Sequence, residues 1–234
     1  DEFNTPSGSG YVFVRDMSQN TGAHTKIANR SMSGELANNN NYGTGSVLSG
    51  NGELVAFTSG ASNLVDGVSG GPHVFVKNLS TSELTLASQS ESGEIGNQYS
   101  AITNMSFSDN GRFIAFESWA DNLVANDFNG VYDVFVRDLW TNQIERVSLG
   151  NNQSEVNQHA RLVGMSDNGN AISFTTYASS IDPFGSNGMD VFLVANPLLD
   201  QFGDVISLET SMPTKGVAYI SDANEIYYKP NIDE

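Results

Sequence analysis

The sequence predicts an all-β protein of the β-propeller class, and two recurring phrases carry that prediction. The first phrase is an apolar run centred on a phenylalanine. It occurs at Tyr11–Val14, His73–Val76, Asp133–Val136 and Asp190–Leu193. The phenylalanines of these runs are 62, 60 and 57 residues apart. A near-constant period of this length is typical of proteins built from structural repeats.

The second phrase is a Ser-x-Asn-Gly tetrapeptide that precedes another apolar run. It occurs at 49–52, 108–111 and 166–169, with a fainter copy at 221–224. An Asn-Gly pair between two apolar runs is a strong hairpin signal, because the two-residue turn that it favours needs positive φ at both residues. Each repeat is therefore predicted to contain a tight hairpin.

One repeat, followed in chain order, predicts four strands. We expect these strands at 101–108, 112–118, 133–138 and 143–147. The hairpin joins the first two, a long loop over 119–132 joins the middle two, and a short turn over 139–142 joins the last two. Four antiparallel strands per repeat make one blade of a β-propeller, and no segment has a sustained helical period.

The two ends of the chain predict how the propeller closes. The opening fragment supplies a third and a fourth strand, and the closing fragment supplies a first and a second strand. Together they complete one blade beside three intact ones. We therefore expect four blades, a ring closed by pairing of the N-terminal and C-terminal strands, and a single domain over 1–234.

The repeat resembles a known family in its motifs. Ser-Asp-Asn-Gly-Arg-Phe-Ile-Ala-Phe-Glu-Ser at 108–118, Asp-Val-Phe-Val-Arg-Asp at 133–138 and the Thr141-Asn142 turn resemble the TolB-like, WD-repeat-related propeller repeat of bacterial exported proteins. The resemblance implies a platform that binds a protein or another ligand in the periplasm or outside the cell. Related propellers occur in peptidases and polysaccharide lyases. The repeats here are longer than is usual for the family, and four blades are fewer than the six or so typical of it. These departures leave open a fragment of a larger propeller, a monomer, or a homodimer that completes the ring.

Composition narrows the classes of partner. The chain has 27 acidic and 10 basic residues, a net charge of −17, and no basic stripe that could neutralise phosphates. Nucleic acid and membrane insertion are therefore not expected, and no apolar run approaches the ~18 residues needed to span a bilayer. The absence of cysteine excludes disulfides and thiolate metal sites.

One loop has the spacing of a cation site. Asp127, Asn129 and Asp133 place side-chain oxygens at positions one, three and seven, and Val131 offers its carbonyl at position five. This alternation suits calcium, although no glutamate follows at position twelve. In the alternative interpretation, these residues only turn the chain, and Asp133 accepts hydrogen bonds from backbone amides of the loop.

A second group of candidates lies where first strands begin, next to the expected central channel. Tyr42, Tyr99 and His159 occupy matching places in successive repeats, and Trp119 directly precedes a long loop. The three residues could line a binding mouth or fill the narrow hole that four blades leave. Trp119 could supply an aromatic platform for a sugar or could pack against Leu123 and anchor its loop.

Two functional hypotheses follow from these residues. The first is a non-catalytic binding or scaffold propeller that recognises a protein or a glycan through its blade loops, with calcium as a stabilising ion. The alternative is a polysaccharide-acting lyase or hydrolase, or a fragment of one, with its site at the channel mouth. The three histidines lie in no catalytic motif, which favours the first hypothesis.

Overall fold

The computed structural model describes residues 10–17, 25–39, 45–69, 71–150, 153–181 and 188–199, except for the side chains of 102 and 103, and the backbone of 216–220 and 226–230. Its strands form four antiparallel sheets. Sheet I contains β1 (Phe13–Arg15) and β2 (Thr25–Ile27). Sheet II contains β3 (Ser46–Leu48), β4 (Leu54–Ser59), β5 (His73–Asn78) and β6 (Leu84–Leu86). Sheet III contains β7 (Ser100–Phe107), β8 (Phe113–Ser118), β9 (Asp133–Asp138) and β10 (Ile144–Arg146). Sheet IV contains β11 (Ala160–Met165), β12 (Ala171–Thr176), β13 (Asp190–Ala195), β15 (Ile226–Pro230) and β14 (Gly216–Ile220), in that spatial order.

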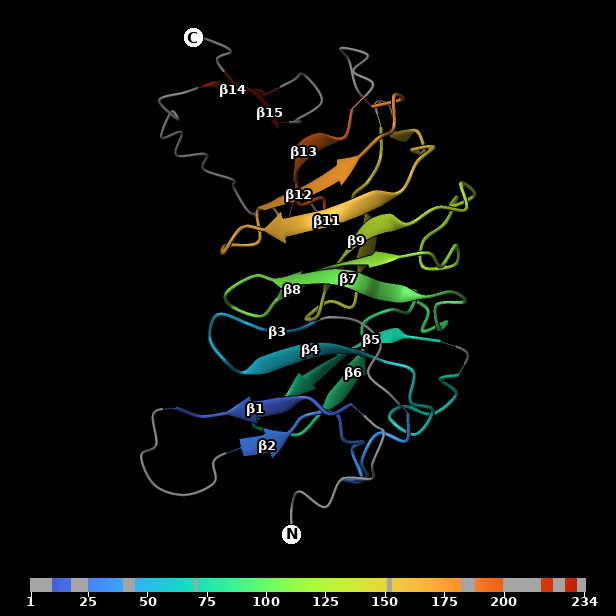
Figure 1. Ribbon diagram of the computed structural model, residues 1–234, viewed down its shortest axis with the longest axis vertical. Helices are drawn as coiled ribbons and strands as arrows, with labels where there is room; N and C mark the ends of the chain where they lie inside the picture. Colours follow the sequence, from blue (N-terminus) through green and yellow to red (C-terminus); the bar gives the residue numbers. More distant parts are fainter. Residues whose placement is uncertain are drawn as a thin grey trace.

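Sheets II and III are meanders in which each strand pairs with the next one in the chain. The strands of sheet III lie within one residue of the ranges that the sequence predicts. The sheets follow one another in chain order along the long axis of the molecule, from β1 and β2 at the bottom to β11–β13 above (Figure 1). This stacking of meander sheets agrees with an all-β protein of propeller type.

The expected closure of the ring is not seen among the described strands. There β1 and β2 pair only with each other, whereas β15 pairs with β14 and, through Leu193 and Ile226, with β13. Sheet I and the β14–β15 pair lie at opposite ends of the row of sheets (Figure 1). Their strands are therefore too far apart to share hydrogen bonds.

Among the described residues, the core consists of three apolar clusters, one at each junction between successive sheets. In sheet II, for example, Phe57 and Phe75 face sheet I, whereas Ala56 and Val74 face sheet III. Because the middle strands are covered on both faces, they are continuous apolar runs rather than alternating ones. The recurring phenylalanines form stacked cross-strand pairs in sheets II, III and IV, with ring centroids 5.7, 6.1 and 5.5 Å apart.

The hairpins that the Asn-Gly pairs predict are present, but the predicted turn type is wrong. Only the glycine takes positive φ, at 72° for Gly52, 72° for Gly111 and 76° for Gly169. The amide of Gly52 donates to the carbonyl of Ser49 (2.9 Å), and Oγ of Ser49 donates to Oδ1 of Asn51 (2.7 Å). The serine and asparagine side chains therefore hold a longer turn, in which asparagine keeps a negative φ.

Successive hairpins are also bonded to each other. The amide of Asn51 donates to the carbonyl of Asp109 (2.9 Å), and the amide of Asp109 donates to that of Asp167 (2.7 Å). We call this end of the sheets the hairpin rim. The opposite end, with the loops that follow β4, β8 and β12, is the loop rim.

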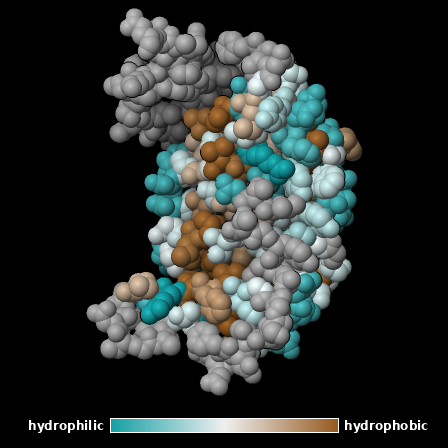
Figure 2. Space-filling model, in the orientation of Figure 1, coloured by the Kyte–Doolittle hydropathy of each residue, from teal (hydrophilic) through white to brown (hydrophobic). Residues whose placement is uncertain are grey.

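Apolar side chains also gather in a band along the face viewed in Figure 2, where the first strands of sheets II to IV lie in Figure 1. Within the described residues, no helix is long and apolar enough to cross a membrane.

Candidate functional site

The loop between β8 and β9, residues 119–132, brings together two groups of side chains at the loop rim of sheet III. The first is an aromatic group around Tyr132. The ring of Tyr132 lies 5.6 Å from that of Trp119 and 5.4 Å from that of His159, centroid to centroid. The guanidinium of Arg161 covers the Tyr132 ring at 4.6 Å. The arrangement is a continuous row of rings with a cation over its central member.

Hydrogen bonds fix this row to the backbone. Nε1 of Trp119 donates to the carbonyl of Gly130 (2.9 Å), and the amide of Tyr132 donates to Nδ1 of His159 (2.9 Å). Trp119 thus anchors its own loop through Gly130 and Tyr132, whereas the sequence suggested packing against Leu123, and its side chain stays 41% exposed. The loop and the ring therefore hold each other in place.

Tyr99 lies beside Trp119. Its carbonyl accepts a hydrogen bond from the Trp119 amide (2.9 Å), and its ring packs on Gly71. A methyl group on Gly71 would lie 2.5 Å from Cδ1 of Tyr99. The structure thus gathers three of the four predicted ligand-binding residues, Tyr99, Trp119 and His159, at one rim. The fourth, Tyr42, lies outside the described residues.

Two members of the group were not predicted. Glu117 is 1% exposed, and its Oε2 pairs with Nη1 of Arg161 (2.9 Å), while its Oε1 accepts from the Leu162 amide (2.9 Å). Burial raises the pKa of Tyr132, Arg161 opposes that rise, and Glu117 and Tyr99 add to it. The sequence does contain a signal for Glu117, because it is a charge inside an otherwise apolar strand.

The second group is a buried charge cluster centred on Arg146. Its Nη1 lies 2.8 Å from Oδ1 of Asp127, 3.0 Å from Oε1 of Glu155 and 3.6 Å from Oδ2 of Asp133. Its Nη2 donates to the carbonyl of Asn126 (3.0 Å). Arg146, Asp127 and Asp133 are all buried. One guanidinium therefore gathers three carboxylates from the loop, the start of β9 and the segment after β10.

The carboxylates of this cluster titrate away from their ordinary values. Burial raises the pKa of Asp127 to about 6; Arg146 opposes this rise, whereas Asp133, Glu155 and Asp121 add to it. Burial also raises the pKa of Asp133, against hydrogen bonds from Ser148 and Asn129. Burial acts in the same direction on Glu155, but hydrogen bonds from the Phe128 amide and from Arg146 hold its pKa below the usual range.

The predicted calcium ligands belong to this cluster. Asn129 donates to Oδ2 of Asp133 (2.8 Å), and its Oδ1 accepts from the amide of Val131 (3.2 Å). Asp127 and Asp133 turn their carboxylates toward Arg146. Among the described residues no three His, Cys, Asp or Glu side chains are grouped to hold a metal ion. A calcium ion held by Asp127 and Asp133 would have to displace the guanidinium of Arg146. Calcium binding at these residues stays a prediction. The hydrogen bonds that Asp133 was expected to accept come here from the side chains of Asn129 and Ser148.

Comparison with known proteins gives matches at the level of fold. No family model matches the sequence, and no curated protein does. Among solved structures, the chain is similar to TolB from Acinetobacter baumannii, with 16% identity and a TM-score of 0.43 over 95% of this chain and 44% of that one. Putative TolB from Agrobacterium tumefaciens has 15% identity and a TM-score of 0.45, over 80% of this chain and 52% of that one. The tricorn protease has 15% identity and a TM-score of 0.49, over 96% of this chain and 19% of that one.

The meander sheets and the motifs at 108–118 and 133–138 resemble those of a TolB-like β-propeller. The chain spans about half or less of the solved chains that it matches. At these identities the similarity concerns the path of the chain through its sheets. The activities of the matched proteins are therefore properties of those proteins only.

Proposed function

We propose that this chain is a non-catalytic binding module that recognises a protein or a glycan through aromatic side chains at the loop rim of sheets III and IV. One observation carries the proposal: large aromatic side chains are exposed there on loops otherwise rich in Ser, Asn and Gly. The exposed fractions are 44% for Tyr99, 41% for Trp119, 81% for Phe128 and 62% for Tyr177. Exposed aromatic residues are enriched at binding interfaces, where they contribute much of the affinity.

The rigidity of the site supports a binding role. The bond from Trp119 to Gly130 and the stack on Tyr132 fix the tryptophan before any ligand arrives. A side chain that is already ordered loses little entropy on binding, so its contact area contributes more to affinity.

The alternative of a polysaccharide-acting enzyme draws less support from the same residues. Nδ1 of His159 already accepts a hydrogen bond from the chain, and the buried carboxylate of Glu117 is bonded to Arg161 and to the backbone. Both groups hold the rim together in this arrangement. A general acid or base needs a proton-exchanging atom directed at the substrate.

The proposal extends to the setting of the module. We place it in the periplasm or outside the cell, on the strength of the repeat motifs at 108–118 and 133–138. The four successive sheets support four blades, and because the two end sheets do not pair among the described strands, we place these blades in a larger or dimeric ring.

The test compares two tryptophans on opposite rims. Native protein, Trp119→Ala and Trp140→Ala are applied to a glycan array and to a displayed library of protein domains. Trp140 is the matched control because it is 69% exposed and lies in the turn between β9 and β10, away from the loop rim. We expect a ligand whose affinity falls about tenfold or more in Trp119→Ala and is unchanged in Trp140→Ala. Thermal melts check that both variants are folded.

Either of two results would contradict the proposal. One is that the ligands of the native protein bind Trp119→Ala equally well. The other is time-dependent cleavage of a polysaccharide that His159→Gln abolishes, which would establish the enzyme alternative instead.

A further inference from the structure

The two sheets at the ends of the row expose apolar side chains whose counterparts are buried in the sheets between them. In sheet I, Phe13 is 53% exposed, whereas Phe75 and Phe135, at the same place in sheets II and III, are 0% exposed. In sheet IV, Val191 is 68% exposed and Leu193 is 37% exposed. The residues at these two places in sheets II and III are all buried: Val74, Val76, Val134 and Val136. Each end of the row therefore presents an open sheet face.

Burial along the strands shows the same difference. In sheet III, every residue of β8 and β9 is buried. In sheet IV, burial alternates along β12 and along most of β13. Such alternation in an antiparallel sheet means that one face is covered and the other is open. The face stays open although β15 and β14 extend sheet IV, because they pair at the edge of β13.

The three described junctions between successive sheets are built in one way. In each, the phenylalanine of β5, β9 or β13 packs in one cluster with the two apolar residues that flank the matching phenylalanine of the preceding sheet. These sets are Val12 and Val14 with Phe75, Val74 and Val76 with Phe135, and Val134 and Val136 with Phe192. By the same rule, Val191 and Leu193 are the pair for one more phenylalanine, and Phe13 is a phenylalanine of that kind at the other end of the row.

A basic residue adds a polar bond to two of these junctions. Nζ of Lys77 in sheet II donates to the carbonyl of Arg30, which follows β2 (3.1 Å). Nη1 of Arg137 in sheet III donates to the carbonyls of Ala87 and Gln89, which follow β6 (3.3 and 2.6 Å). In both cases the cation reaches backbone carbonyls of the preceding sheet.

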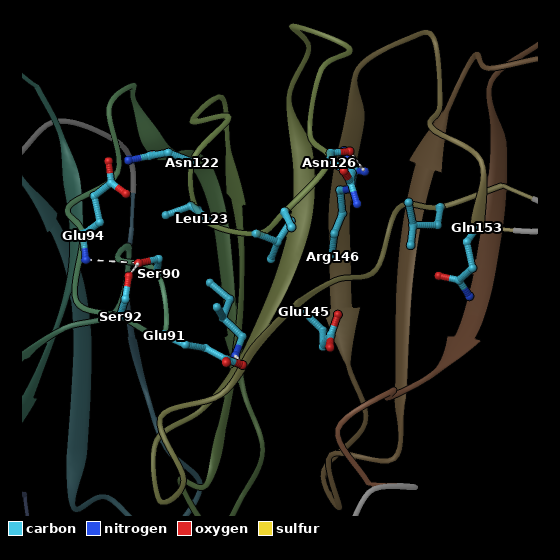
Figure 3. Close-up of a pocket in the computed structure, with 14 residues that line it drawn as sticks. Ser90, Glu91, Ser92, Glu94, Asn122, Leu123, Asn126, Glu145, Arg146 and Gln153 are labelled. Atoms are coloured by element: carbon cyan, nitrogen blue, oxygen red, sulfur yellow. Dashed lines mark hydrogen bonds between the residues drawn. The ribbon is translucent and has the colours of Figure 1, made fainter.

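The outer side of the junction between sheets II and III contributes less. A groove of about 720 Å³ lies there, and Figure 3 shows Glu91 and Glu94 on one side of it, with Glu145 farther across. The bonds of Glu91 across this side are long, at 3.3 Å from the Ile144 amide to its Oε1 and 3.4 Å from Nδ2 of Asn142 to its carbonyl. The two sheets are therefore joined at their faces, by the apolar cluster and the bonds of Arg137.

Arg15 is the matching basic residue of sheet I. Its side chain is exposed and bonds to no other described residue. Because Lys77 and Arg137 both donate to carbonyls of the sheet before their own, Arg15 is placed to donate to carbonyls of a sheet that precedes sheet I. This observation is independent of the exposed apolar residues, and it indicates the same missing neighbour.

We infer that the open face of sheet IV is a docking surface for sheet I of a second copy of this chain, so that two copies form one ring. Phe13 of one copy packs between Val191 and Leu193 of the other, and Arg15 donates to backbone carbonyls of that other copy. The occupant is a second copy because the two open faces of one chain are the two halves of one junction, and they lie at opposite ends of the row (Figure 1).

The number of copies follows from symmetry. A head-to-tail contact either closes into a ring or continues as a filament. Two copies of four sheets make eight, which lies within the usual range of about four to eight blades, whereas a third copy would exceed it. The inference rests on the larger or dimeric ring proposed above and names its second member, but it does not depend on ligand binding at the loop rim.

The first measurement is sedimentation velocity of the full chain at about 0.15 M salt, which screens the repulsion between chains of net charge −17. Native protein should have twice the mass of one chain. Phe13→Glu and Val191→Lys should each raise the dissociation constant at least about tenfold, because each places an unpaired charge in an apolar junction. Leu48→Glu is the matched control, since Leu48 is 49% exposed but lies in sheet II, away from both ends. Thermal melts check that each variant is folded.

The second measurement mixes Phe13→Glu with Val191→Lys in equal amounts. In a ring with one copy of each, the new lysine meets the new glutamate at one junction, and the other junction is native. The mixture should therefore dimerise at least about tenfold more tightly than either variant alone. A contact that pairs identical faces would give no such recovery.

Three results would each overturn the inference: a monomer at every concentration, masses that continue beyond two chains, or a mixture that binds no more tightly than its components. None of them alters the ligand test that compares Trp119→Ala with Trp140→Ala. Failure of the two-copy ring and failure of the proposed binding role are therefore distinguished.

Discussion

Sheets II and III place opposite chemistry at the same three repeat positions. Sheet II has the apolar trio Val68, Leu86 and Ile95, which pack in one core cluster. Sheet III has Asp127, Arg146 and Glu155 at the corresponding places, 59 or 60 residues later in the chain. Both sheets keep the same strand order and pairing. The propeller framework therefore tolerates either solution, and the charged one must be explained by something other than the fold.

The charged residues of sheet III differ from the apolar residues of sheet II because they form directional hydrogen bonds. Apolar contacts stabilise a junction but do not fix individual atoms, whereas Arg146 bonds to Asn126 and Asp127, and Glu155 bonds to the Phe128 amide. These bonds position the loop whose Gly130 carbonyl anchors Trp119. Burying charges costs desolvation energy, so the cluster adds little stability for its size. What it contributes is a defined loop under the exposed aromatic side chains.

The largest effect should come from removing the central cation. Arg146→Leu copies the residue of sheet II but leaves Asp127 and Asp133 buried without a counter-charge. We expect the free energy of unfolding to fall by about 3–5 kcal/mol, measured by urea denaturation at neutral pH. A loss below about 1 kcal/mol would mean that the cluster is not buried as described.

The control for this variant transplants the whole junction. Asp127→Val, Asp133→His, Arg146→Leu and Glu155→Ile together reproduce the residues of sheet II. Stability should return to within roughly 2 kcal/mol of the native value, because no unpaired charge remains. Trp119 should become more mobile in fluorescence anisotropy. An unchanged anisotropy would contradict the idea that the charges position the loop.

An effect of intermediate size is expected from pH, because the charged junction of sheet III contains a carboxylate that titrates near neutral pH whereas the apolar junction of sheet II does not. The pKa of Asp127 is raised to about 6 in the folded chain, above its ordinary value of 3.8. Folded protein therefore holds this proton more tightly than unfolded protein, so its contribution to stability is full below about pH 4 and is lost as pH rises through 6. Relative to Asp127→Asn, native protein should lose roughly 2 kcal/mol between pH 4 and pH 7. Parallel curves for the two proteins would show that Asp127 is not desolvated.

Calcium should have the smallest effect. With Arg146 between the carboxylates, millimolar calcium against excess chelator should change the melting temperature by less than about 1 °C, since only a ligand that binds the folded state raises stability. A rise of several degrees that Asp127→Ala abolishes would instead establish the calcium site that the spacing of Asp127, Asn129 and Asp133 predicts.

Local patterns predicted the fold well. The phenylalanine runs and the Ser-x-Asn-Gly phrases located the strands of sheet III to within a residue, because a strand boundary depends on nearby turn residues. The turn type was missed because Oγ of Ser49 and Oδ1 of Asn51 bond to each other, a side-chain interaction that the dipeptide rule ignores. Ring closure was inferred from strand order alone, and strand order does not determine how far apart two sheets lie.

The arrangement of the candidate residues was predictable only in part. Tyr99 and His159 were singled out because they occupy matching places in successive repeats, and Trp119 because it directly precedes a long loop; ligand binding by these residues stays a prediction. Arg146, the partner of Asp127, was not predicted. It lies nineteen residues away, in a strand to which the sequence pattern gave no functional role. Alignment of the repeats would have revealed it, since an arginine replaces Leu86 at that position.

The bonds between successive hairpins divide the molecule into a constant end and a variable end. Because Asn51, Asp109 and Asp167 are joined amide to carbonyl, lengthening any one hairpin would pull its neighbours out of register. The loops that follow β4 and β8 are also joined to the next sheet, but at the residue where each loop ends: the amide of Ser100 donates to the carbonyl of Pro72 (2.9 Å), and the amide of Ala160 donates to the carbonyl of Tyr132 (2.8 Å). New recognition surfaces can therefore arise at that end by changing the sequence and length of the loop residues before these bonds, while the bonded hairpins at the other end keep their lengths.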